Sequence, residues 1–324
     1  MRKFSMFAIA ALAALAGSHT ALAKPAPVRT PAVGAAVKDC SSCPEVIRVP
    51  AGSFIMGASI EEERRHGMSE ANLGRSMPLR KVTFAKGFAM GKTPVTVAQF
   101  RSFIDETKHP TSESCFNQRY NDGHFIYEKA RGYNWRSPGF PQDDRHPVVC
   151  VSAEDAEAYV KWLSKKTGKR YAIPNEAQYE YALRAGTTTS FFWGDNQDAT
   201  ACLYSNQPDF DQADELKAPR GPEYRFQCSD GYAWTSPVGI YKPNPWGLYD
   251  MQGNIWEWTA DCWNNDYNGA PTDGSTWTTG DCDARPSRGG SYGNASHSAF
   301  AGIRAPRSAS YTGHSWGFRV VRLD

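Results

Sequence analysis

The feature that most restricts the fold of this chain is a long C-terminal part without helical periodicity. After Gly186, roughly 135 of the 324 residues show no sustained helical spacing of apolar side chains. The stretch is rich in Trp, Gly, Asn and Asp, with short apolar runs and a strand-like end at 318–322. A compact domain rarely contains so long an irregular stretch unless something besides core packing holds it. We therefore expect disulfides or bound metal ions to stabilise this part.

The cysteines of the chain favour disulfides. There are eight of them, an even number, and all follow the N-terminal export segment described below. Pairing of sequence neighbours gives four bridges: Cys40–Cys43, Cys115–Cys150, Cys202–Cys228 and Cys262–Cys282. A redox or zinc function for the Cys-x-x-Cys motif is the alternative, but the motif has neither a strand-to-helix context nor a second copy.

The N-terminus has the pattern of a cleavable signal peptide. Arg2 and Lys3 precede an apolar run at 4–17, and Ala21-Leu22-Ala23 provides a small-x-small cleavage motif. We predict a signal peptide at 1–23, cleaved near Ala23, because the run is too short for a membrane anchor. The chain has 36 Lys and Arg against 34 Asp and Glu, so cleavage leaves no formal net charge. This balance argues against nucleic-acid binding, and we expect a monomeric periplasmic or secreted protein.

The remaining sequence fits a tail followed by one domain. Residues 24–44 form a tail that carries the Cys-x-x-Cys motif, and residues 45–324 contain no repeat and no linker. Short alternating runs predict strands at 46–49, 54–56, 82–84 and 88–90. Apolar spacing and N-terminal capping residues predict helices at 96–107, at 152–166 and from Asn175 to Gly186. The sequence therefore predicts a single α+β domain.

Two loops contain carboxylates at spacings that suit a hard cation. Asp250 and Glu257 lie seven residues apart around Gly253, and Asn206 and Asp230 form a second pair. Calcium binds six to eight oxygens, which a curled loop supplies from carboxylates and carbonyls. By spacing alone, turns with solvated acids are the simpler interpretation of both loops.

Two further patterns lie near the C-terminus. Gly289-x-Ser291-x-Gly293 matches a hydrolase nucleophile motif, but the acid and histidine that must follow the serine are not in the required order. Six arginines, no lysines and no acids lie between Arg285 and Arg322. An all-arginine set suggests fixed geometry toward carboxylates, carbonyls or an anionic ligand, and a structural role beneath aromatic rings is equally compatible with it.

Several longer strings together resemble the formylglycine-generating enzyme, or sulfatase-modifying factor, family. The strings occur in order over nearly all of 45–323: VPAGSFIMG (49–57), PVT (94–96), HPVVCVS (146–152), YAIPNEAQYEYA (171–182), NPWGLYDMQGNIWEWT (244–259), RGGSY (288–292) and GFR (317–319). The resemblance implies a C-type-lectin-like fold with little regular secondary structure, held by disulfides and calcium. It also implies two structural calcium sites, formed by Asn206, Gln207, Asp230 and Tyr232 and by Asp250, Gly253, Ile255 and Glu257.

The chain departs from the family at the residues that carry its activity. The family's aerobic enzyme converts a sulfatase cysteine to formylglycine with copper held by two cysteines after the Arg-Gly-Gly-Ser segment. In this chain Asn294 and Ala299 take those positions, and no cysteine follows Cys282. Copper(I) requires soft thiolate ligands, so we expect neither copper at this position nor formylglycine formation by that route.

Three functions remain open from the sequence. The first is an exported oxidoreductase-type maturation factor for a peptide, a protein or a peptide-derived small molecule, similar to the periplasmic members that complete the pyoverdine chromophore. Its pocket would contain Ser291, Asn294, His297, Trp256 and Arg304. The others are a non-catalytic module that binds a peptide or glycan and a structural protein of the cell envelope. The fold does not choose among them.

Overall fold

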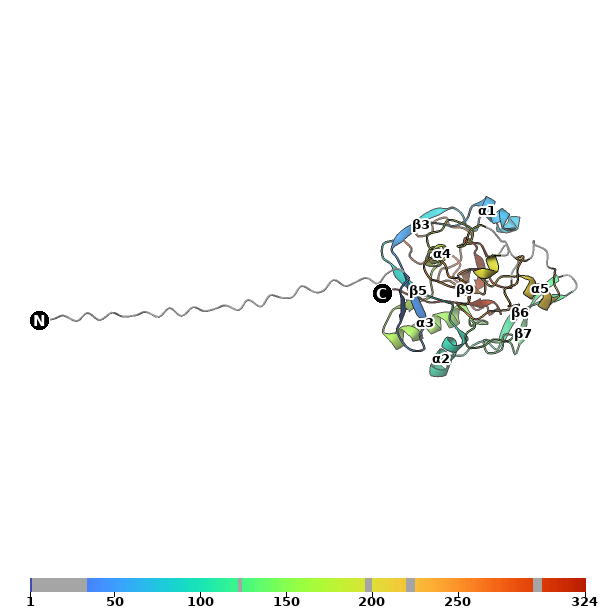
Figure 1. Cartoon of the computed structure of the whole chain (residues 1–324), viewed down its shortest axis with the longest axis horizontal. Helices are drawn as coiled ribbons and strands as arrows, with labels where there is room; N and C mark the ends of the chain where they lie inside the picture. Colours follow the sequence, from blue (N-terminus) through green and yellow to red (C-terminus); the bar gives the residue numbers. More distant parts are fainter. Residues whose placement is uncertain (2–33, 122–123, 196–199, 220–224, 294–298) are drawn as a thin grey trace. The chain divides into compact units, whose positions relative to one another are not determined.

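The three predicted helices are present and begin at the predicted caps (Figure 1). They are α2 (Val97–Thr107), α3 (Ala153–Thr167) and α4 (Glu176–Arg184). Each begins with a capping box, in which the N-cap side chain and the third helical side chain satisfy each other's backbone N–H groups. Aromatic side chains join α2 to α3, since Phe103 and Tyr159 lie with ring centroids 5.6 Å apart. The capping residues and the helical periodicity therefore identified all three helices.

This computed structural model describes residues 1, 34–121, 124–195, 200–219, 225–293 and 299–324. Ala32–Asp324 forms one compact unit. The predicted signal peptide at 1–23 falls almost wholly outside the described residues. No helix in the described ranges has the length and apolar character that a membrane span needs.

The larger sheet has five strands and joins distant parts of the chain. Its order is β1 (Ala36–Lys38), β2 (Glu45–Val49), β5 (Phe88–Gly91), β13 (Val321–Arg322) and β8 (Tyr171–Ala172), all antiparallel. The C-terminal strand thus lies inside the sheet. β1 lies in the segment predicted as a tail. The Cys40–Cys43 turn folds β1 back onto β2, so this strand is part of the sheet. The folded domain accordingly begins before residue 45.

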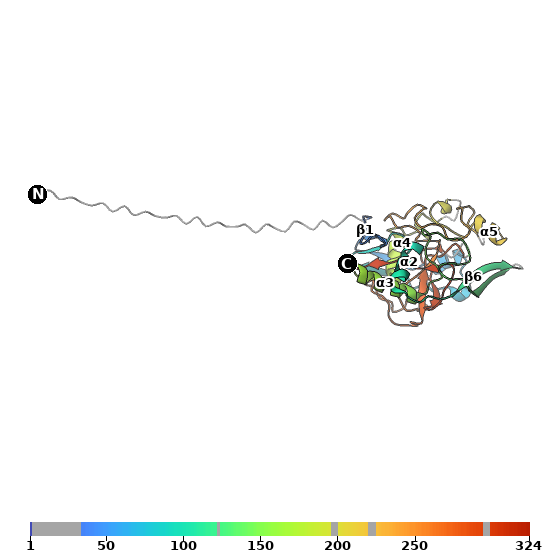
Figure 2. The same ribbon diagram turned by 90° about the horizontal axis from the view of Figure 1, so that it is seen from below.

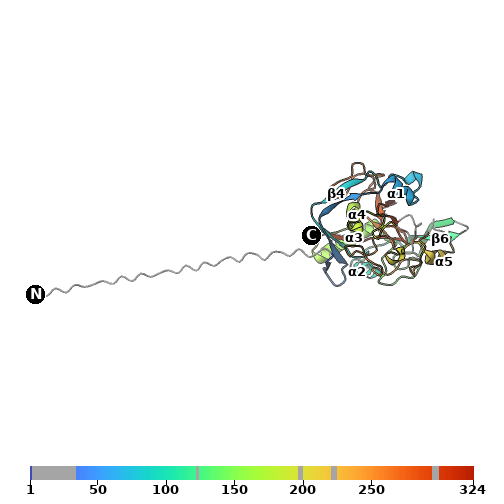
Figure 3. The same cartoon turned by 45° about the horizontal axis from the view of Figure 1, so that its top comes forward.

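The second sheet gathers the C-terminal segments. Its order is β11 (Ala305–Ser308), β10 (Ala284–Arg288), β9 (Trp256–Trp258) and β12 (Trp316–Gly317). Two hairpins complete the strands: β3 (Gly52–Met56) with β4 (Arg80–Phe84), and β6 (Ser114–Asn121) with β7 (His124–Arg131). The β6–β7 hairpin extends from the edge of the domain (Figure 2), and β4 lies on the same side as α1 (Ile60–Arg65; Figure 3). The short helices are η1 (Glu70–Asn72), η2 (Ala201–Leu203) and α5 (Phe210–Leu216).

Disulfides and buried ion pairs hold the irregular C-terminal part. All four predicted disulfides are present, no free cysteine remains, and two of the bridges, Cys202–Cys228 and Cys262–Cys282, lie within this part. Arg288 reaches both Glu176 and Glu180 of α4, and Arg319 binds Glu257 of β9. These ion pairs are almost completely buried, so removal of one partner would leave an uncompensated charge inside the protein.

Candidate functional site

Two tryptophans from the second sheet mark the candidate site. Parallel pairing of β12 with β9 places Trp316 directly beside Trp256. Their rings stack with centroids 6.0 Å apart and an interplanar angle of 15°. The indole N–H of Trp316 donates to Ser287 Oγ at 3.2 Å, which fixes the ring. The sheet register therefore builds a rigid aromatic wall from two segments far apart in sequence.

Two cavities meet at this wall. The tryptophan cavity, of about 470 Å³, is bordered by Met68, Arg75, Trp256, Arg304, Arg307 and Trp316, among others. The tyrosine cavity, of about 370 Å³, is bordered by Phe116, Tyr127, Gly293, Arg307, Tyr311, Ser315 and Trp316. Arg307 and Trp316 border both cavities, so the two cavities share part of their lining.

A larger cavity, of about 690 Å³, lies over β3 and α4. Its lining includes Phe54, Tyr181 and Trp246, and its two charged residues already have partners. Arg184 binds Glu180, and Glu62 accepts a hydrogen bond from Ser190. This cavity therefore offers apolar contacts and one carboxylate, Glu62, that has a hydrogen-bond donor but no salt-bridge partner among the described residues.

Arg304, predicted in the pocket, lines the tryptophan cavity but is occupied by structural contacts. Its Nε and Nη2 donate to the two carboxylate oxygens of Glu176 at 2.7 and 2.6 Å. Its guanidinium also lies 4.6 Å from the ring centre of Trp263 and 4.2 Å from that of Tyr267. Since Arg304 is only 1% exposed, it supports the cavity wall and has little capacity to bind a ligand.

Arg307 differs from the other arginines in this part of the chain. The remaining five, Arg285, Arg288, Arg304, Arg319 and Arg322, each contact a carboxylate. Within the described residues, no carboxylate lies within 4.0 Å of Arg307, which is exposed. Its guanidinium lies 5.4 Å from the ring centre of Tyr311 and 5.1 Å from that of Trp316. The arginine is thus positioned by ring contacts while its charge stays uncompensated.

A buried polar layer lies behind the tyrosine cavity. Tyr292 Oη is hydrogen-bonded to Nδ1 of His314, and both side chains are buried. Burial lowers the pKa of His314 to about 3, so the imidazole is neutral, and burial raises the pKa of the Tyr292 hydroxyl. The Ser291 hydroxyl, which accepts from the Gly293 backbone N–H at 3.2 Å, is 1% exposed. These groups lie behind the cavity lining.

The predicted pocket residues are therefore only partly brought together. Trp256 and Arg304 border one cavity, whereas Ser291 borders neither of the two cavities at the tryptophan wall. Asn294 and His297 lie outside the described residues. The sequence singled out the arginine set without distinguishing Arg307. Trp256 was among the predicted pocket residues, but nothing in the sequence pointed to Arg75 or to Trp316. Strand register alone brings Trp316 beside Trp256.

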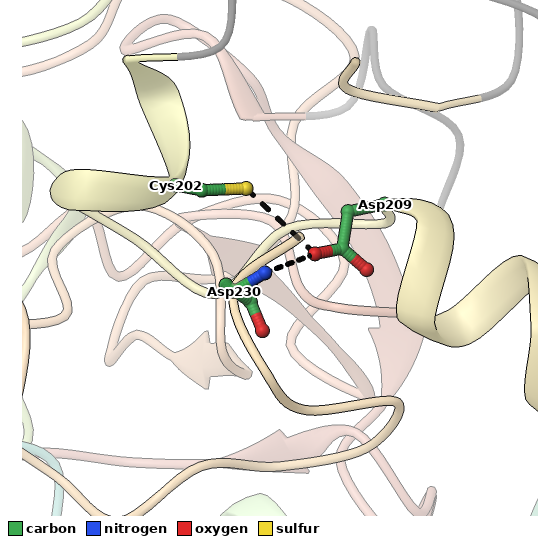
Figure 4. A group of neighbouring side chains, drawn as sticks. All are labelled: Cys202, Asp209 and Asp230. Atoms are coloured by element: carbon green, nitrogen blue, oxygen red, sulfur yellow. Dashed lines mark hydrogen bonds between the residues drawn. The ribbon is translucent and has the colours of Figure 1, made fainter. Parts of the chain in front are cut away.

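The first predicted calcium loop has a donor set that fits the ion. Oδ1 of Asn206 is buried and has no hydrogen-bond partner among the described residues. Burial and the nearby Asp209 carboxylate raise the pKa of Asp230 to about 8. Figure 4 shows the Asp209 carboxylate facing both Asp230 and Cys202, and Asp209 Oδ2 accepts from the Asp230 backbone N–H at 2.7 Å. Two close carboxylates and an unpartnered amide oxygen are hard donors suited to calcium, whereas the sulfur of Cys202 is held in a disulfide.

The second predicted loop fits calcium less fully. Oδ1 of Asp250 is buried and has no hydrogen-bond partner in the described ranges, and burial raises its pKa to about 6. Glu257, however, receives Arg319 Nε at 2.7 Å and Nη2 at 2.7 Å, and it also accepts from the Tyr179 hydroxyl at 3.1 Å. The Glu257 carboxylate is therefore already compensated by protein groups.

The two loops contact each other closely. The Asn254 backbone N–H donates to the Asn206 carbonyl at 2.7 Å. Gly253 has a φ of +82°, and a Cβ there would lie 2.2 Å from the Asn206 carbonyl oxygen. Only glycine meets both requirements at this position. An ion bound at either loop would thus stabilise the packing of both.

Comparison with known proteins identifies the family. Residues 33–323 match the Sulfatase-modifying factor enzyme 1-like domain. The formylglycine-generating enzyme of Mus musculus is 29% identical over 273 residues, which are 76% of this chain and 66% of the mouse protein. The chain therefore spans slightly less than two thirds of that relative's length.

Two further likenesses cover more of the chain. The mouse protein named inactive C-alpha-formylglycine-generating enzyme 2 is 28% identical over 306 residues, covering 86% of this chain and 85% of that one. The structure of PvdO from Pseudomonas aeruginosa superimposes with a TM-score of 0.71 at 34% identity, covering 91% of this chain and 100% of PvdO. This chain belongs to the sulfatase-modifying factor family, and it has that family's C-type-lectin-like α+β fold.

Proposed function

We propose that this chain is an exported maturation factor of the oxidoreductase type, acting on a peptide or a peptide-derived small molecule. The observation that carries the proposal is an aromatic groove with an uncompensated arginine, beside the Arg-Gly-Gly-Ser segment, in a chain whose cysteines all form disulfides. Gly293, two residues after Ser291, borders this groove.

Copper does not fit the corresponding positions of this chain. Ala299 is buried, and its carbonyl accepts from Gln252 Nε2 at 2.6 Å. A methyl group supplies no ligand, and Asn294 offers only a hard amide. We therefore assign no reaction step to copper. In the proposed reaction the substrate loses two electrons and two protons, which dioxygen accepts to form hydrogen peroxide.

The roles of the chain's own residues are binding and orientation. Arg307 would hold an anionic substrate group, and the rings of Trp316 and Tyr311 would limit the positions it can take. Calcium, where bound at the Asn206–Asp230 loop, would stabilise the fold and take no part in the chemistry. We further propose a periplasmic or secreted, monomeric protein, in line with the predicted signal peptide and the disulfides.

Oxygen uptake tests the proposal. The mature chain, residues 24–324, is incubated in air with a tyrosine-containing peptide or with catechol while dissolved oxygen and peroxide are recorded. We expect substrate-dependent oxygen loss with matching peroxide. With a peptide that carries a free carboxylate, this loss should be reduced in Arg307→Gln and unchanged in Arg136→Gln, whereas neutral catechol gives Arg307 no anionic group to hold. Arg136 is a suitable control because it is exposed and lies 4.2 Å from the ring centre of Trp135, away from both cavities. No oxygen uptake with either substrate would contradict the oxidoreductase assignment.

One observation favours a second function. The relative named as inactive covers more of this chain than the mouse formylglycine-generating enzyme does, at nearly the same identity. A non-catalytic protein that binds a peptide or glycan, or that serves in the envelope, is therefore the alternative. Ligand binding without oxygen uptake would support it.

A further inference from the structure

We propose that the two cavities form one site for a molecule that carries an aromatic ring and a free carboxylate, with Arg307 as the carboxylate-binding residue. The proposal deepens the proposed function, because it names the substrate class. It concerns binding alone, so it holds whether or not the bound molecule is then oxidised.

The first argument is an excess of positive charge at the tryptophan cavity. Arg75, Arg304 and Arg307 all border it. Glu176 neutralises Arg304, but no carboxylate lies within 4.0 Å of Arg75 or Arg307 among the described residues. Burial and the charges of Arg304 and Arg307 lower the pKa of Arg75, with Glu63 opposing them. An anionic ligand would relieve this repulsion.

Strand pairing increases the repulsion at Arg307. Register in the second sheet places Arg285 of β10 directly opposite Arg307 of β11. Like charges at opposed positions destabilise an antiparallel pair unless other groups compensate them. Arg285 binds Glu157 at 3.1 Å, so of the two opposed arginines only Arg285 has a carboxylate partner among the described residues. Among the described residues, Arg307 thus has arginine neighbours and no acidic partner. This arrangement favours the binding of an anion that is not part of the chain.

The second argument is the geometry of Arg307. Its Nη1 donates to the Pro306 carbonyl at 3.0 Å, and its guanidinium lies near the rings of Tyr311 and Trp316. A guanidinium held against rings keeps its plane fixed and can present an N–H edge to a carboxylate, whose two oxygens match that fork. Arg307 then loses less side-chain conformational entropy when a ligand binds.

The third argument is the contrast between the two cavities. The tyrosine cavity is bordered by Phe116, Tyr127 and Tyr311, and Phe116 and Tyr311 stack with centroids 4.9 Å apart. Tyr127 is 51% exposed, so its ring is accessible to a ligand. Since Arg307 borders both cavities, a molecule bound by its carboxylate there can place a ring among these aromatic side chains. A peptide ending in an aromatic residue has this form, as does an N-acylated aromatic amino acid.

Calorimetric titration of the mature chain with matched probes tests the site. The probes are N-acetyl-tyrosine, its amide, which lacks the charge, and N-acetyl-alanine, which lacks the ring. We expect N-acetyl-tyrosine to bind about tenfold more tightly than either, as one charge-assisted interaction is worth on the order of 1.4 kcal/mol or more. Arg307→Gln should abolish the preference for the acid over the amide, and Arg136→Gln should keep it.

Further variants keep the test decisive. Arg307→Lys retains the charge without the fork and should show an intermediate preference, even if the glutamine variant folds poorly. Tyr127→Ala should weaken the binding of both tyrosine probes and leave the binding of N-acetyl-alanine unchanged. Equal binding of acid and amide, a preference that survives in Arg307→Gln, or no binding of any probe would each overturn the proposal. Oxygen uptake is not part of this test, so loss of the oxidoreductase function alone would leave the binding result unaffected.

Discussion

At the scale of single residues, buried charges behave differently according to whether they have a partner. Glu257 is completely buried, and its charge is compensated because Arg319 contacts both of its carboxylate oxygens. Asp261 is also buried, but among the described residues it accepts only backbone N–H groups, from Glu176 at 2.6 Å and from Trp277 at 2.8 Å. Burial and the charge of Glu176 raise the pKa of Asp261 to about 7.

This raised pKa predicts how stability depends on pH. A carboxyl group whose folded pKa lies above its unfolded value binds more protons in the folded state, so its contribution is complete below the unfolded value and is lost as pH rises through about 7. The difference in unfolding free energy between the natural chain and Asp261→Asn should therefore fall by about 3 kcal/mol from pH 5 to pH 8. Urea unfolding at both pH values measures it. The exposed Asp105→Asn serves as control, and a pH-independent difference for Asp261→Asn would refute the argument.

At the scale of elements, the two predicted calcium loops form one structural unit, since Asn254 and Gly253 pack directly against Asn206. We predict that a calcium chelator lowers the thermal midpoint of the natural chain and has little effect on Asp230→Ala. The exposed Asp105→Ala should respond like the natural chain. An identical midpoint with and without the chelator would contradict calcium binding.

Glu257 is a poor choice for this calcium test. Glu257→Ala would leave Arg319 buried without its carboxylate, which costs about 3–5 kcal/mol whether or not calcium binds. A lower midpoint in that variant is thus expected from the ion pair alone. Asp230 is better, because it makes no salt bridge within the described ranges.

The elements also show which parts of the fold can be predicted from sequence. The three longer helices carry their own caps and periodicity, so their positions follow from local residues. The disulfides followed from sequence order because each joins neighbouring cysteines. β8, β9, β12 and β13 are two or three residues long and form through pairing with distant segments, which no local pattern specifies.

At the scale of the whole molecule, the same limit applies to the site. Trp256 and Trp316 lie 60 positions apart in the chain and meet only through the register of β9 and β12. Arg75 joins them from the segment after η1. The family strings identified the fold and the missing thiolates. Arg307 stands out because each of the other five C-terminal arginines has a carboxylate partner. Those partners are known only from the folded chain.

This chain has the family fold, and we propose that it lacks the family's copper-dependent chemistry. The most direct test is mass spectrometry of a sulfatase-derived cysteine peptide after aerobic incubation with the mature chain and copper. An authentic formylglycine-generating enzyme is the positive control. We predict that the cysteine remains unconverted with this chain under conditions in which the control converts it. Formation of formylglycine by this chain would contradict the account.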